Sequence, residues 1–153
     1  MRQLRYLVFA FALAALPATA VAAESSSPLG QPPLSEVHAQ NPWFRLLPNH
    51  HAAGYMVLRN TGTGTAILTG ASSPDCGSLT VRQGNKLRMR MAADITVPAH
   101  GSVAFAAGGN QLICLQPKVK AGQRLPFALH FKDGSVLLLM APVHAATSTP
   151  PGA

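Results

Sequence analysis

Residues 125–143 read LPFALHFKDGSVLLLMAPV, and this stretch decides the fold class. Two apolar runs, 125–131 and 136–143, flank a Lys-Asp-Gly turn, which is the pattern of a β-hairpin. Outward from this hairpin, no window of the chain carries a sustained helical period. Instead, short apolar or alternating runs recur with Gly, Pro, Asn and Asp between them, at 37–44 (interrupted by Pro42), 54–60, 66–70, 79–83, 87–91, 95–97, 103–106 and 112–115. Short strands at this spacing predict one all-β domain, a sandwich or barrel.

The first residues have the layout of a secretory signal peptide. Arg2 and Arg5 precede an apolar run over 6–16, and small residues follow it. The apolar run is too short to anchor the chain in a bilayer, and no lipobox-type cysteine follows it. We expect a signal peptide over 1–23, a disordered Pro/Ser-rich linker over 24–36, the domain over 37–144 and a disordered tail over 145–153. The mature protein is then periplasmic, with no stable membrane insertion after cleavage.

Composition and charge exclude two classes of function. The chain has a formal charge of +7, and removal of Arg2 and Arg5 leaves ten basic and five acidic side chains, a net charge of +5. The basic residues are spread along the chain and aromatic residues make up only 6%, so a nucleic-acid surface is not predicted. No close carboxylate pair, Ser-His-Asp context or C-x-x-C motif is present, so we do not expect an enzyme.

Two cysteines, Cys76 and Cys114, are an even number in an exported chain. A single disulfide is therefore the default interpretation. Two free thiols, or a site in which two thiolates bind Cu(I), are the alternatives.

Several segments, in order, resemble the periplasmic copper chaperones of the PCu(A)C type. They are NPWFRLLP, AAGYMVLRNTG, ASSPDCGSLTVRQ and the long run from LRMRMAADITVPAHG to LLLMAPV. The resemblance covers about 37–143 and implies a cupredoxin-like Greek-key β-sandwich or barrel. It also implies Cu(I) as the cargo, and a copper-acceptor or oxidase-assembly protein as the partner.

The family holds Cu(I) with a His after the SSP-type turn, a Met in the next strand and a His-x-Met pair further on. By resemblance, the first position falls on Arg82, or on Ser78 if the spacing to the Met is kept. The Met falls on Met89, which matches, while the His-x-Met pair falls on Gln111 and Ile113, which do not. A permanent cation at position 82 repels Cu(I). The resemblance therefore predicts a degenerate copper site with weak or no binding.

Other residues offer a partial replacement. Met89 and Met91 are two apart, so on a strand they share a face and present two thioethers, unless they are core methionines. His50 and His51 form an adjacent pair in a Pro-Asn-His-His loop, where exposed polar histidines are the plainer interpretation. If positions 111 and 113 face the metal end, Cys114 faces the opposite side of its strand, which favours a disulfide over a ligand role.

Two hypotheses of different class follow. The protein is a copper-chaperone-like protein whose family copper site is largely lost, or it is a metal-free interaction or structural module of the cell envelope.

Overall fold

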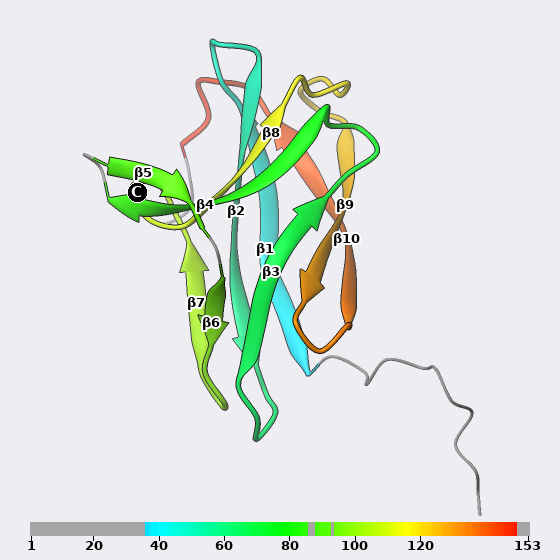
Figure 1. The fold of residues 1–153 in the computed structure, drawn as a ribbon. Helices are drawn as coiled ribbons and strands as arrows, with labels where there is room; N and C mark the ends of the chain where they lie inside the picture. Colours follow the sequence, from blue (N-terminus) through cyan, green and yellow to red (C-terminus); the bar gives the residue numbers. More distant parts are fainter. Residues whose placement is uncertain (1–35, 86–87, 93, 150–153) are drawn as a thin grey trace, which may run out of the picture. The chain divides into compact units, whose positions relative to one another are not determined.

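The computed structural model describes residues 36–85, 88–92 and 94–149, which form ten strands (Figure 1). The predicted signal peptide, most of the predicted linker and residues 150–153 of the predicted tail lie outside the described residues. Within the described part, no helix is long and apolar enough to cross a membrane. The strands are β1 (Val37–Leu46), β2 (His51–Asn60), β3 (Ala66–Ser72), β4 (Ser78–Asn85), β5 (Arg88–Met91), β6 (Ile95–Val97), β7 (Ser102–Phe105), β8 (Gln111–Leu115), β9 (Arg124–Phe131) and β10 (Val136–His144). The predicted all-β class is confirmed.

The strands form two layers joined through β10. The first layer has the order β5-β4-β8-β2-β1, with β7 also paired to β2; the second has the order β10-β9-β3-β6. β10 is antiparallel to β9 along most of its length, and its last residues pair in parallel with β1. On the edge of β2 that faces away from β1, the first half of the strand pairs with β8 and the second half pairs with β7.

The hairpin predicted at 125–143 is present as β9 and β10. Its β9 strand alternates strictly, and the inward side chains of Leu125, Phe127, Leu129 and Phe131 are all buried. In the turn, Asp133 accepts hydrogen bonds from the Ser135 hydroxyl (2.6 Å) and backbone N–H (2.9 Å). These bonds hold the pKa of Asp133 below its usual value, because they stabilise the charged carboxylate.

One contiguous core fills the space between the layers. It includes Phe44 and Leu58 of the first layer and Leu68 and Leu129 of the second, each no more than 1% exposed. The rings of Phe44 and Phe127 meet edge to face, with centroids 5.4 Å apart. In each strand with an alternating sequence, the apolar side chains face this core, and their burial stabilises the fold.

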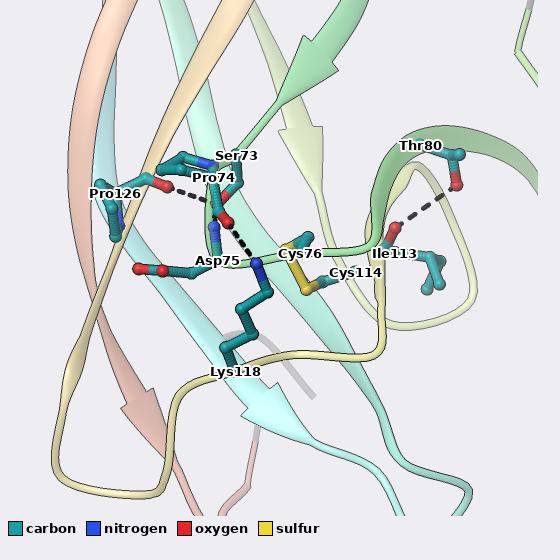
Figure 2. The surroundings of a disulfide bond; sticks show 9 residues. All are labelled: Ser73, Pro74, Asp75, Cys76, Thr80, Ile113, Cys114, Lys118 and Pro126. Atoms are coloured by element: carbon teal, nitrogen blue, oxygen red, sulfur yellow. Dashed lines mark hydrogen bonds between the residues drawn. A yellow bond between two sulfur atoms is a disulfide. The ribbon is translucent and has the colours of Figure 1, made fainter.

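The predicted Cys76–Cys114 disulfide is confirmed. Its sulfur atoms are 2.04 Å apart and the Cα atoms 5.4 Å apart, so the alternatives of free thiols and a two-thiolate copper site are wrong. Cys114 lies in the core, one residue before the end of β8, and Cys76 lies in the turn before β4. Figure 2 shows this turn held on both sides: Ser73 Oγ donates to the Pro126 carbonyl (2.6 Å) and Lys118 Nζ to the Pro74 carbonyl (3.2 Å).

Candidate functional site

A second, smaller apolar cluster lies on the outer face of the first layer, separate from the core. Trp43, Ala53, Tyr55 and Ile113 form it, and all four are buried. The Trp43 ring lies 5.3 Å from the Tyr55 ring, and it meets the His144 ring edge to face at 4.8 Å. Strand alternation explains the cluster, because Phe44, between Trp43 and Arg45, points the other way, into the core.

The strand register brings together, on this same outer face, positions that the resemblance assigns to the family's copper ligands. Arg82 on β4 pairs with Gln111 on β8, and Thr80 pairs with Ile113. Residues paired directly across strands share a face, and so do residues two apart on one strand. Because Ile113 faces outward, Thr80, Gln111 and Arg82 face outward too. Cys114 faces the core, as its neighbour relationship to Ile113 predicted.

The methionine strand lies at the edge of the first layer, beside Arg82. In the register of β4 with β5, Arg82 pairs with Met91 and Gly84 pairs with Met89. Met91 is 59% exposed, so it is not a core methionine. Position 82 therefore lies between Met91 on one side and Gln111 on the other.

The predicted histidine pair lies at the other end of β8. His51 pairs with Leu115, whereas Arg82 pairs with Gln111, four residues earlier on β8. Four residues of strand span about 13 Å. The structure therefore does not bring His50 and His51 to the methionine strand. Among the described residues, no group of three or more His, Cys, Asp or Glu side chains is placed to hold a metal ion.

The sequence reasoning missed a set of hydrogen-bond donors on the outer face. Arg45 Nη2 donates to the Tyr55 hydroxyl (3.4 Å) and Nη1 to the Ser148 carbonyl (3.2 Å). Among the described residues, the buried side-chain atoms without a hydrogen-bond partner are Trp43 Nε1, Arg45 Nε and Arg82 Nε. The alternation of Trp43 and Arg45 in NPWFRLLP was the available signal, since residues two apart on a strand share a face.

Comparison with solved structures defines the class of this fold. The apo PCuAC domain from PmoF1 matches with a TM-score of 0.64 and 21% identity, over 72% of this chain and 94% of that domain. The Cu(I) form of DR1885 from Deinococcus radiodurans matches with a TM-score of 0.58 and 25% identity, over 73% and 78% of the two chains. The protein is thus a cupredoxin-like β-sandwich of the PCu(A)C type, as predicted.

Sequence comparison narrows the class to a family. Residues 37–143 match the LpqE-like family, whose description is "Putative lipoprotein LpqE-like". The chain belongs to this LpqE-like family. The putative lipoprotein Lxx21020 of Leifsonia xyli subsp. xyli (strain CTCB07) is 28% identical over 114 residues, which cover 70% of this chain and 69% of the relative.

Proposed function

We propose that the protein is an exported, copper-chaperone-like β-sandwich whose family copper position no longer holds Cu(I), and that it acts as a metal-free interaction module of the cell envelope. The expected partners are copper-acceptor or oxidase-assembly proteins. The observation that carries the proposal is the position of Arg82, paired with Met91 on one strand and with Gln111 on the other. A copper ion bound between these strands would lie beside a guanidinium group.

The repulsion between the Arg82 guanidinium and a bound Cu(I) ion sets the size of the expected loss in copper affinity. Two unit charges of the same sign 4 Å apart repel by about 4 kcal/mol at the effective dielectric of a protein surface. This repulsion corresponds to roughly a thousandfold loss of affinity. The amide of Gln111 and the aliphatic Ile113 supply no soft ligand to offset the loss, since Cu(I) prefers thioether, thiolate and imidazole.

Export is supported by two independent features. The predicted signal peptide directs the chain out of the cytoplasm, and the Cys76–Cys114 disulfide is typical of oxidising compartments. N-terminal sequencing of the protein from a cell-envelope fraction tests this part of the proposal. A mature protein that begins near residue 24 is expected, and an uncleaved cytoplasmic protein would contradict it.

A Cu(I) competition titration of the mature protein against a calibrated chelator tests the loss of the site. The wild-type protein is expected to bind no Cu(I) above the chelator background. The matched variant restores the family pattern with Arg82→His, Gln111→His and Ile113→Met, and it should gain one-to-one binding. The change at Ile113 conserves volume, so the outer cluster is expected to tolerate it. Tight wild-type binding would refute the proposal.

The exposure of Met91 favours a second candidate, weak Cu(I) handling by two thioethers. Met89 and Met91 are two residues apart on the edge strand β5, and the alternation of a strand predicts that they share a face. In this case the wild-type protein binds Cu(I), and the Met89→Ala/Met91→Ala variant loses binding. The same titration therefore separates the two candidates.

A further inference from the structure

The outer face of the second layer exposes large apolar side chains. Along β10, the residues on either side of Leu138 pack against the core, so Leu138 and Met140 face outward. Leu138 is 77% exposed and Met140 is 49% exposed. In the strands of this layer, all of which the structure describes, Arg124 is the one Lys, Arg, Asp or Glu residue. A contiguous apolar surface of this kind is typical of a binding site.

A hollow of about 610 Å³ lies on this face. Pro126 and Ala128, on the middle strand β9, line it, and so do Met140 and Leu138, their partners on β10. Ser72, the partner of Ala128 on β3, lines the other side. The short side chains on β9 therefore leave a groove beside the longer ones on β10. Its volume lies in the range of ligand pockets, about 300–1,000 Å³.

The hydroxyl groups that line the groove already have partners within the protein. Ser73 Oγ donates to the Pro126 carbonyl (2.6 Å), as Figure 2 shows. Ser72 Oγ forms a hydrogen bond with His130 Nε2 (2.8 Å). An apolar ligand in the groove therefore covers no unpaired hydroxyl. The groove suits a hydrocarbon chain, whose transfer out of water is favourable without any hydrogen bond.

Two cationic side chains contact residues that line the groove. Arg124 lies at the start of β9 on its outward face, and its Nη2 donates to the Met140 carbonyl (3.2 Å). Lys118 Nζ donates to the Pro74 carbonyl (3.2 Å), and Pro74 lines the groove (Figure 2). Both acceptors are neutral, so both cations keep their charge and have further N–H donors. Asp75, beside Pro74, offsets one of these two charges, and the other remains.

The two cations lie at the same end of the groove. Pro126 pairs with Met140 on β10, and its carbonyl accepts the hydrogen bond from Ser73, in the turn that holds Lys118. The carbonyls that bind Arg124 and Lys118 therefore flank Pro126 on its two sides. An anion placed at this end can accept charge-assisted hydrogen bonds, which are stronger than those between neutral groups.

We propose that this groove binds a single-chain anionic amphiphile of the fatty-acid type. Its carboxylate lies at the end that carries Arg124 and Lys118, and its hydrocarbon chain lies along β9, over Ala128 and against Leu138. Charge complementarity sets the direction of the ligand, and the exposed apolar side chains of β10 cover its chain. The groove lies on the second layer and the copper positions lie on the first, so this inference goes beyond the proposed function and does not depend on it.

The test is a calorimetric titration of the mature protein with laurate, below the concentration at which laurate forms micelles. We expect saturable one-to-one binding. Octanoate has the same carboxylate and a shorter chain, and it should bind at least about tenfold more weakly, because each CH₂ group that leaves water raises the affinity by about fourfold. Dodecyltrimethylammonium has the chain length of laurate and the opposite charge, and it should also bind at least about tenfold more weakly.

Variants locate the site. Leu138→Ser removes an exposed apolar side chain of the groove and should lower the laurate affinity about tenfold. Arg124→Gln keeps an N–H donor for the Met140 carbonyl and removes the charge, so it should weaken laurate about tenfold and leave dodecyltrimethylammonium no weaker. Lys132→Gln removes a charge from the β9–β10 turn, at the far end of β9, and should leave the laurate affinity unchanged. Thermal unfolding of each variant confirms that it folds.

Four outcomes would overturn the inference: no saturable laurate binding, equal binding of octanoate and laurate, or full laurate affinity in either Leu138→Ser or Arg124→Gln. Binding to phosphatidylglycerol vesicles without binding to free laurate would also overturn it and would assign this face to a bilayer surface. Self-association of the wild type that is lost in Leu138→Ser, without laurate binding, would assign the face to a second copy of the chain. Because no copper is present, none of these results decides the copper titration.

Discussion

Removal of the Cys76–Cys114 disulfide should cost the domain a large part of its stability. The two half-cystines are 38 residues apart, and strands β4 to β7 and most of β8 lie in the loop they close. In the chain-entropy model, a cross-link that closes a loop of this length stabilises the folded state by about 4 kcal/mol. For a domain of this size, the loss corresponds to a fall of roughly 15 °C in the melting temperature.

Guanidinium unfolding with and without a water-soluble phosphine measures this loss. Reduction breaks the bond without removing an atom, so it separates the cross-link from packing. The Cys76→Ala/Cys114→Ala variant should lose more than reduction does, because Cys114 is fully buried and truncation leaves a cavity. A loss on reduction below about 1 kcal/mol, with an unchanged denaturant slope, would refute the loop-closure argument.

Three further perturbations test packing and charge. In Gly54→Ala, the new Cβ would lie 2.6 Å from Phe44 Cε1, so unfolding experiments should show a loss of about 1–3 kcal/mol; wild-type stability would contradict the packing. Leu129→Ala truncates a fully buried core residue and should lose about 2–5 kcal/mol in the same assay, whereas a loss below 1 kcal/mol would contradict its burial. The lowered pKa of Asp133 means that the hydrogen bonds from Ser135 stabilise the fold above the unfolded-state pKa near 3.8 and are lost as the pH falls through the folded value. In Asp133→Asn, the acid-side decline in stability should be smaller than in the wild type, and identical pH profiles would refute the assignment.

The strands could be predicted from the sequence because the alternation of apolar and polar residues, with turn residues at each end, is visible within each short segment. β9 shows this clearly, since every second residue from Leu125 to Phe131 is buried. The interruption predicted at Pro42 was wrong: β1 continues from Val37 to Leu46 and absorbs the irregularity in a β-bulge, with Asn41 at a φ of 48°. A bulge depends on the pairing partner, which the local sequence does not specify.

The candidate site could be predicted only in part, because its geometry depends on strand register. The resemblance gave the positions Arg82, Gln111 and Ile113, and the pairing of β4 with β8 brings them onto one face. The distance from His51 to the methionine strand depends on which residue of β8 each strand meets. Met91 is exposed because β5 lies at the edge of the first layer, and the sequence of β5 alone does not show that it is an edge strand.

At the positions that the resemblance assigns to copper ligands, this chain carries side chains of different chemistry from the family's ligands. An imidazole or thioether at a family position offers a lone pair to a cation, whereas a guanidinium offers only hydrogen atoms. The guanidinium group of Arg82, on a strand position paired with both Met91 and Gln111, therefore disfavours a metal cation at this position. Under the proposed function, Arg82→His should remove this repulsion, and Gln111→His with Ile113→Met should supply the missing ligands.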